Sequence, residues 1–272
     1  MELVLGLVTD QHFGPEASFG GKLRKLTRSG PGLAKAFVTR MNDVVKPDLV
    51  VNLGDCIEDE SLEADRARYA ACINVLRGAR APLANVAGNH DTFRLTPAEL
   101  LAIWKRPDLE RLYHSFDLGG FHFVVLHTRE RKDVDVTVGD EQMRWLAADL
   151  AAGSSPTVVL MHHSAADQDL RGNRWFEGSP HICLVEERRA LRRMLRDSGR
   201  VLAVFNGHLH WNHVDVIDGL PFVTLQSLIE NLDEDAPGRP AAAHAVVRLT
   251  ERRVLVEIEG AERARYQFDR GA

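Results

Sequence analysis

Short apolar runs alternate with amphipathic stretches along the first three quarters of the chain. Near-continuous apolar runs are typical of strands that are covered on both faces. They occur at residues 3–8, 49–53, 83–87, 121–127, 157–161 and 201–205. Between them, apolar positions recur at helical spacing over residues 32–45, 63–77, 140–151 and 186–197. This alternation of strands and helices predicts an α/β fold.

The last quarter of the chain is dominated by strand patterns. Asp218-Gly219 separates two apolar runs and is typical of a tight hairpin, and further runs follow at 245–249 and 254–258. We expect one domain over residues 1–272, with two packed mixed sheets flanked by helices, the second sheet being finished by antiparallel strands from about 213–259. Two segments, 14–32 and 165–180, have few apolar anchors and many Gly, Arg and Asp residues, so we expect surface loops there.

Composition and charge exclude several classes of protein. The chain has 272 residues, of which 44% are hydrophobic and 27% charged, so a collagen-like or disordered chain is excluded. A net charge of -5 lacks the basic excess of a protein that binds many phosphates of DNA, so a nucleic-acid partner is not expected. The hairpin at Asp218-Gly219 is a candidate contact between copies of the chain, which leaves a homo-oligomer open.

Cysteine usage and apolar run lengths bear on location. Three cysteines with no CxxC pair argue against a disulfide framework and against a thiolate zinc site, and they favour a reducing compartment, the cytoplasm. The first apolar run is too short for a signal peptide, and none approaches the ~18 residues of a membrane span. We therefore expect a cytoplasmic protein with no membrane partner.

Residues of the kind that bind metals follow five of the expected strands. They are Asp10, His12, Asp55, Asn89, His162, His208 and His210. The carboxyl ends of strands in an open α/β sheet form a binding crevice, so these five connections can converge. In an extended segment residues i and i+2 point the same way, which would turn both members of each D-x-H or H-x-H pair toward one ion.

The donor types indicate the kind of ion. Two carboxylates, one amide oxygen and four imidazoles, with no thiolate, suit Mn, Fe or Zn. Seven donors are too many for one tetrahedral ion and suit two divalent or trivalent metal ions that share a bridging ligand. Asp55 is the candidate bridge.

The five motifs together resemble those of the calcineurin-like metallophosphoesterases. In chain order they are Asp10-x-His12, Gly54-Asp55, Gly88-Asn89-His90-Asp91, His162 and Gly207-His208-x-His210. The resemblance covers residues 10–210 and implies that family's αββα sandwich. It also implies a first ion held by Asp10, His12, Asp55 and His210, and a second ion held by Asp55, Asn89, His162 and His208.

The same resemblance implies a reaction at phosphorus. A hydroxide formed at the two ions would attack the phosphoryl group. His90 resembles the family's histidine that protonates the leaving group or stabilises charge on the phosphoryl group. We expect a carboxylate, either Asp91 or Glu58, to orient its imidazole.

Other residues are candidates for substrate contact. Asn89 is one, and His163 is expected to be a hydrogen-bonding neighbour of the ligands rather than a ligand. Arg171 and Arg174 lie next to two aromatic residues and either bind substrate or pack locally. A basic cluster either steers anionic substrates toward the site or lies on a solvated loop. That cluster consists of Lys22, Arg24, Lys25 and Arg28.

The second motif narrows the substrate class. It reads Gly54-Asp55-Cys56-Ile57-Glu58-Asp59-Glu60, without the arginine found in phosphoprotein phosphatases, and no tyrosine lies near it as in purple acid phosphatases. The resemblance then favours a compact phosphodiesterase that acts on a small soluble phosphate ester, such as a cyclic nucleotide, a glycerophosphodiester or a nucleoside-diphosphate-linked compound. The alternatives are a phosphomonoesterase of the same fold, a metal-binding scaffold without catalysis, and a non-haem iron oxygenase with two histidines and one carboxylate.

Overall fold

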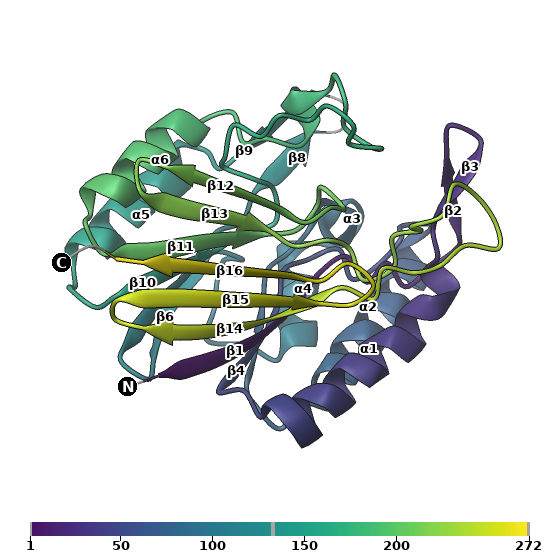
Figure 1. The fold of residues 1–272 in the computed structure, drawn as a ribbon, viewed down its shortest axis with the longest axis horizontal. Coiled ribbons are helices and arrows are strands. Elements are labelled where there is room, and N and C mark those ends of the chain that lie inside the picture. Colours follow the sequence, from purple (N-terminus) through teal and green to yellow (C-terminus); the bar gives the residue numbers. More distant parts are fainter. Residues whose placement is uncertain (1, 132–133, 271–272) are drawn as a thin grey trace.

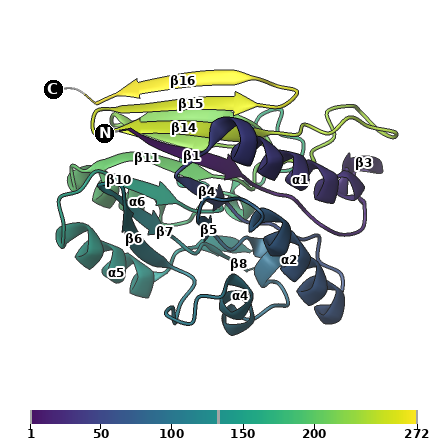
Figure 2. The same cartoon turned by 90° about the horizontal axis from the view of Figure 1, so that it is seen from below.

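Two six-stranded mixed sheets lie face to face and are flanked by helices (Figures 1 and 2). This computed structural model describes residues 2–131 and 134–270. The first sheet has the order β16 (Ala264–Asp269), β15 (Arg253–Glu259), β14 (His244–Thr250), β1 (Leu3–Val8), β4 (Leu49–Asn52) and β5 (Leu83–Asn85). The second has the order β12 (His213–Ile217), β13 (Leu220–Thr224), β11 (Val201–Asn206), β10 (Thr157–Leu160), β7 (Phe121–Val125) and β6 (His114–Leu118).

Parallel strands form the part of each sheet that carries the candidate site. In the first sheet β1, β4 and β5 are parallel, and in the second sheet β7, β10, β11 and β13 are parallel. The buried side chains of both sheets interdigitate between the layers and include Leu5, Leu7, Phe123 and Phe205. Burial of one such side chain contributes roughly 1.5–3 kcal/mol, so this layer is a large part of what holds the sheets together.

Helices pack on part of the outer face of each sheet. Buried apolar side chains place α1 (Gly30–Arg40), α2 (Leu62–Leu76) and α4 (Pro97–Trp104) on the first sheet, and α5 (Asp140–Ala151) and α6 (Arg188–Asp197) on the second. Two short hairpins lie outside the sheets, β2 (Ala17–Phe19) with β3 (Lys22–Lys25), and β8 (Arg129–Arg131) with β9 (Asp135–Thr137). No helix within residues 2–131 and 134–270 is long and apolar enough to cross a bilayer.

The expected α/β architecture with two packed mixed sheets and flanking helices is confirmed, but the C-terminal strands differ from the expectation. Only β12 and β13 finish the second sheet, and they form the hairpin expected at Asp218-Gly219. Strands β14 to β16 pair instead with β1 in the first sheet, and β16 lies beyond residue 259. The reason is that β1 is an interior strand: without β14 it would present a buried edge with unpaired backbone groups.

The segment 14–32 also differs from the expectation of a surface loop. It contains the hairpin of β2 and β3 and the start of α1, whose Pro31 stands in the first turn. The α-helix ends at Arg40 rather than at residue 45, and a π-helical turn leads to Lys46 in the left-handed conformation. Hairpins of three or four residues per strand have too few alternating positions to be recognised by periodicity.

Candidate metal centre

The seven candidate ligands all lie at the carboxyl ends of parallel strands. Asp10 and His12 follow β1, Asp55 follows β4, and Asn89 opens the short helix α3 (Asn89–Thr92) after β5. The remaining three come from the second sheet, with His162 after β10, and His208 and His210 after β11. The two sheets thus contribute to one crevice, in which six of the seven residues are buried.

The backbone turns sharply at most of these positions. Five of the seven candidate ligands have a positive φ, namely Asp10 (51°), His12 (43°), Asp55 (54°), His208 (68°) and His210 (55°). Left-handed conformations are uncommon for residues with a side chain, and they are found where the surrounding structure enforces them. The expected extended geometry of the two i, i+2 pairs is therefore wrong, because these side chains converge through turns rather than through the pleat of a strand.

Three side chains form a first group of donors. The Nε2 atoms of His12 and His210 are 3.2 Å apart, and Oδ1 of Asp10 lies 3.6 Å and 3.4 Å from them. Oδ2 of Asp55 lies 3.8 Å from Nε2 of His12. These four residues are the set that the sequence resemblance implies for the first ion.

Asp55 also faces a second group of donors. Its Oδ2 lies 3.2 Å from Nε2 of His162, which is 3.1 Å from Oδ1 of Asn89. The same amide oxygen lies 3.1 Å from Nδ1 of His208. One carboxylate oxygen of Asp55 is therefore directed at both groups, as a bridging ligand requires.

The outward nitrogens of the four imidazoles all face hydrogen-bond acceptors. Nδ1 of His12 lies 3.0 Å from Glu58 and Nδ1 of His210 lies 2.7 Å from Glu230. Carbonyl oxygens take the same place at the second group, that of Leu53 beside Nδ1 of His162 (2.8 Å) and that of Ile182 beside Nε2 of His208 (3.3 Å). A proton held there leaves a lone pair on each inward nitrogen, which is the arrangement of metal-binding histidines.

The nitrogen and oxygen atoms that point into the centre are suited to bind cations. Two imidazole lone pairs, carboxylate oxygens and an amide oxygen within 3–4 Å repel one another unless positive charge lies between them. Among the described residues, Oδ1 of Asp10 is buried without a hydrogen-bond partner. Burial opposes charging of His162, yet Asp55 raises the pKa of His162 to about 10. The charge of Asp55 thus favours positive charge beside His162, and the donor set suits a pair of Mn, Fe or Zn ions.

His90 lies beside this centre with its ring fixed on both sides. Its backbone N–H donates to Oδ1 of Asp55 (3.0 Å), and its Nδ1 lies 2.6 Å from Oδ1 of Asp59, which also pairs with Arg94. Its Nε2 lies 3.3 Å from Nζ of Lys25. Burial and the positive charge of Lys25 lower the pKa of His90.

The carboxylate beside His90 is thus Asp59, and not Asp91 or Glu58 as expected. Asp91 accepts hydrogen bonds from the backbone N–H groups of Asp55, Cys56 and Gly88, so it shapes the turn before α3. Burial, and then the charge of Asp55, raise the pKa of Asp91 to about 7. Glu58 lies 4.0 Å from Nδ1 of His90 and pairs instead with His12 and Lys25.

The other expected substrate-binding residues have varied surroundings. Oγ1 of Thr128 lies 2.7 Å from Nδ1 of His163, whose ring packs 4.1 Å from that of His208. Arg171 is exposed and pairs with its neighbour Asp169. The guanidinium of Arg174 donates to backbone carbonyls, including that of residue 231 (2.8 Å).

The aromatic residues of the same loop lie closer to the candidate ligands than its arginines do. The ring of Trp175 lies 5.3 Å from that of His210, and the ring of Phe176 stacks on that of His208 at 4.7 Å. Nε1 of Trp175 donates to Glu230 (3.1 Å). This loop therefore forms one wall of the centre.

Sequence reasoning misses Asp59 and Glu230 as site residues. Asp59 stands in a run of three acids, and only the register of the loop decides which of them meets His90. Glu230 lies 20 positions after its partner His210, in no recognisable motif. Lys25 stands out in the sequence only as one member of a basic cluster, and no local pattern indicates its burial.

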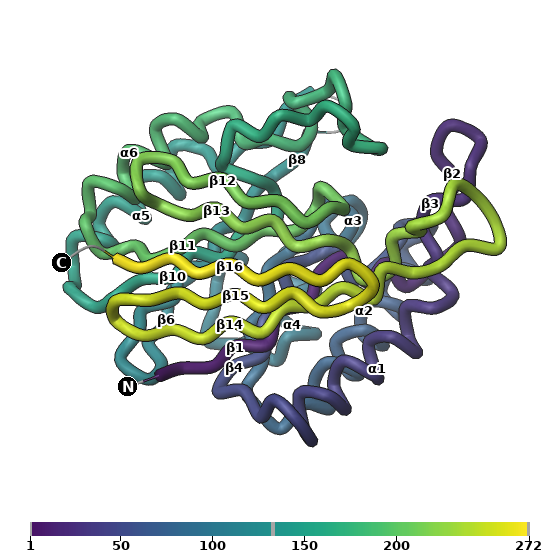
Figure 3. Tube along the Cα trace, in the orientation of Figure 1, coloured from purple at the N-terminus to yellow at the C-terminus, as the bar shows by residue number. Residues whose placement is uncertain are grey.

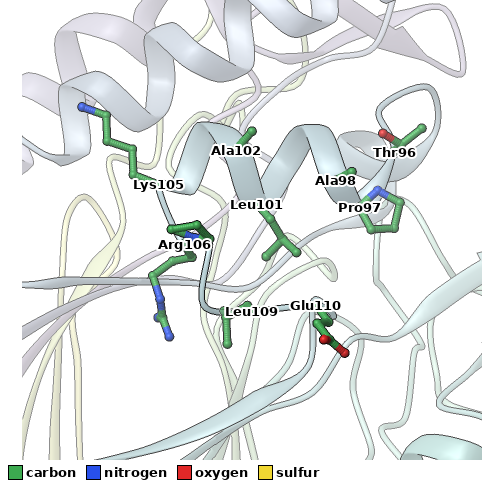
Figure 4. A pocket seen from close by; sticks show the side chains of 10 residues that line it. Thr96, Pro97, Ala98, Leu101, Ala102, Lys105, Arg106, Leu109 and Glu110 are labelled. Atoms are coloured by element: carbon green, nitrogen blue, oxygen red, sulfur yellow. The ribbon is translucent and has the colours of Figure 1, made fainter.

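A cavity of about 690 Å³ lies away from the centre, beside α4 (Figure 4). Leu101 of α4 and Leu109 of the following segment line it, with Lys105 and Glu110 at its rim. It is larger than the space of about 140 Å³ beside His210, but its lining holds one carboxylate and no histidine. Its size alone gives it no chemistry, so the histidine cluster is the candidate active site.

The chain is similar to known phosphoesterases. A family model described as calcineurin-like phosphoesterase matches residues 3–212. A probable cyclic nucleotide phosphodiesterase from Synechococcus sp. is 28% identical over 166 residues, which is 60% of this chain and 58% of that protein. Another from Fibrobacter succinogenes is 21% identical over 210 residues, or 76% of this chain and 73% of that one. This chain therefore spans less than two thirds of the Synechococcus relative.

A solved structure has the same fold over its whole length. The crystal structure of a dimetal phosphatase from Danio rerio covers 99% of both chains with a TM-score of 0.78 and 19% sequence identity. At this identity the likeness concerns the fold, and it places the layers and strand ends described above in a known arrangement.

Proposed function

Because the chain belongs to the calcineurin-like phosphoesterase family, we propose that it hydrolyses a phosphodiester bond in a small soluble substrate with the help of two metal ions. The observation that carries the proposal is the position of Asp55, whose Oδ2 lies 3.8 Å from Nε2 of His12 and 3.2 Å from Nε2 of His162. A single carboxylate between two histidine groups is what a pair of ions needs. The names of the two bacterial relatives favour a cyclic nucleotide or a related diester.

We assign the ions to the two donor groups of the centre. Asp10, His12, Asp55 and His210 would hold the first, and Asp55, Asn89, His162 and His208 the second. When bound, two such cations polarise phosphoryl oxygens and lower the pKa of water, so a nucleophile for phosphorus is available near neutral pH.

His90 is the proposed proton donor. Asp59 accepts a hydrogen bond from Nδ1, which leaves Nε2, 3.3 Å from Nζ of Lys25, as the nitrogen that would transfer the proton. Because burial and Lys25 lower the pKa of His90, a proton at Nε2 is readily released to the leaving alkoxide. His163 and the aromatic residues of the 165–180 loop would then line the substrate, whereas Arg171, paired with Asp169 at the surface, is the weakest of the proposed contacts.

Phosphomonoester hydrolysis is the second candidate. The structural neighbour from Danio rerio, which is named a dimetal phosphatase, favours it. Hydrolysis of monoesters and of diesters would use the same two ions, and the two substrates differ in the charge and size of the groups bonded to phosphorus. An activity assay, rather than the geometry of the metal ligands, therefore distinguishes the two functions.

The test is a substrate panel after loading the protein with Mn, Fe or Zn. We expect bis-p-nitrophenyl phosphate and cyclic AMP or ADP-ribose to be cleaved faster than p-nitrophenyl phosphate. The reverse order would establish the monoesterase instead. Two bound ions per chain with no turnover of any phosphate ester would establish a scaffold, and a single iron would favour the oxygenase.

A variant links the activity to the centre. Asp55→Ala removes the shared carboxylate and should lower turnover by more than about 100-fold together with metal content. Asp108→Ala removes an exposed carboxylate that pairs with Arg106 and should change neither. Full activity in Asp55→Ala would contradict the two-ion assignment.

A further inference from the structure

Lys25 is a buried lysine next to the centre. It ends β3, and only 5% of its surface is exposed, although lysine is almost never fully buried without a partner. The backbone of Lys25 pairs with that of Glu230, and the N–H of Leu26 donates to the carbonyl of Ile229 (3.0 Å). Figure 3 shows the hairpin beside the segment that leads from β13 to β14. The fold thus fixes Lys25 where the ligand-bearing segments meet.

The ammonium group of Lys25 has three N–H donors. It pairs with the carboxylate of Glu58, which also pairs with His12. Nζ lies 2.8 Å from Oε2 of Glu58, and the same oxygen lies 3.0 Å from Nδ1 of His12. Nζ also lies 5.2 Å from the centre of the Trp175 ring, a cation–π contact. Its remaining neighbour is Nε2 of His90, at 3.3 Å.

The contact with His90 locates an oxygen-binding position. Nδ1 of His90 faces Asp59, so Nε2 is the nitrogen left for a substrate oxygen, and in this structure it accepts a hydrogen bond from Nζ of Lys25. An oxygen bound to Nε2 is within reach of Nζ, because the two nitrogens are 3.3 Å apart. Once Nε2 carries a proton it no longer accepts from Nζ, and one oxygen beside the two nitrogens can then accept from both.

We propose that Lys25 is a catalytic residue of this centre, whose ammonium group binds the substrate oxygen beside Nε2 of His90. The inference rests on the proposed function, since it takes that oxygen to belong to a phosphoryl group or to its leaving alkoxide. The second motif has no arginine to bind phosphate, and a lysine from the hairpin supplies positive charge there. A fixed charge in a buried site stabilises the negative charge that develops on these oxygens.

The matched variants are Lys25→Met, which removes the charge, and Lys25→Arg, which keeps it. Lys22→Met is the control, because Lys22 lies on the same hairpin but is exposed and pairs with Glu234. The first measurement is calorimetric titration of the metal-loaded proteins with inorganic phosphate. We expect Lys25→Met to weaken phosphate binding about 10- to 100-fold, as loss of a buried charge-assisted hydrogen bond does. Lys25→Arg should recover most of the loss, and the control should stay within about twofold.

Metal content separates this role from a purely structural one. If Lys25 only supported Glu58 and His12, Lys25→Met would lose metal, and the remaining loaded protein would bind phosphate normally. That result, or phosphate affinity within about twofold of wild type at full metal content, would overturn the inference. Should Lys25→Met not fold, as judged by thermal melting, Lys25→Gln replaces it in the same comparison.

Turnover keeps the two proposals distinguishable. If wild type cleaves bis-p-nitrophenyl phosphate and Lys25→Met is equally fast, the role of Lys25 is refuted and the proposed function stands. If wild type cleaves no phosphate ester but the variants differ in phosphate affinity as expected, the proposed function fails and Lys25 remains an anion-binding residue of the centre.

Discussion

Replacing Glu230 by glutamine should weaken the first ion selectively. Glu230 is 3% exposed, and its Oε2 accepts from Nδ1 of His210 at 2.7 Å. The charge of Glu230 fixes the ring and makes its inward nitrogen a stronger donor. Loss of such an outer carboxylate lowers metal affinity by about 10- to 100-fold, or roughly 1.4–2.7 kcal/mol. The second ion should be unaffected, because backbone carbonyls orient its histidines.

The assay is titration of the metal-free protein with Mn or Zn, followed by calorimetry and by metal analysis after dialysis. We expect two binding events in wild type, one of which weakens in Glu230→Gln. Glu234→Gln, an exposed glutamate of the same segment, is the matched control. Trp175→Phe removes the other hydrogen bond to Glu230 and should leave both affinities within about twofold. Equal weakening of both ions, or no change, would refute the reasoning.

Two further predictions concern other histidines. Asp59→Asn should lower kcat by about 10-fold or more at unchanged metal content, because His90 loses the carboxylate that orients it; stopped-flow rates and metal analysis check this, and an unchanged kcat would remove Asp59 from the mechanism. Burial, and then Arg106, lower the pKa of His114 to about 4 from 6.5, so only the unfolded chain takes up this proton between those values, and stability is lost as pH falls from 6.5 to 4. Between pH 7 and 4.5 the free energy of unfolding should therefore fall by about 2–3 kcal/mol less in His114→Gln than in wild type, as measured by urea titration. An equal fall in both proteins would contradict the burial argument.

The strand ends could be located from sequence because two independent signals coincide there. Apolar runs give the strands, and at three of the five strand ends a glycine precedes the metal-type residue, as at Gly54-Asp55. Cβ atoms placed on Gly88 and Gly207 would lie 2.1 Å and 2.0 Å from Oδ1 of Asp55 and Oγ1 of Thr9, so only glycine fits beside the site. These requirements involve residues that are close together in the chain, so hydrophobic periodicity and motif spacing can predict them.

Contacts between loops could not be predicted from the sequence. Asp59, Glu230 and Lys25 reach the centre through the packing of loops whose course depends on the finished fold. The left-handed conformations of Asp10 and His12 are likewise held by tertiary structure, since such conformations are uncommon for residues with a side chain. Strands β14 to β16 join the first sheet because β14 pairs with β1. This pairing is between segments far apart in the chain, so no local sequence pattern predicts it.

The position of β1 in its sheet sets an order of events during protein synthesis. Leu7 pairs with Ala245 on β14, so β1 acquires this neighbour only after β14, which is far from it in the sequence, has emerged from the ribosome. Until then Asp10 and His12 follow a strand that lacks one of its two neighbours, and before residue 210 is made they also lack His210. A nascent chain that ends before His208 and His210 therefore lacks a donor for each of the two proposed ions.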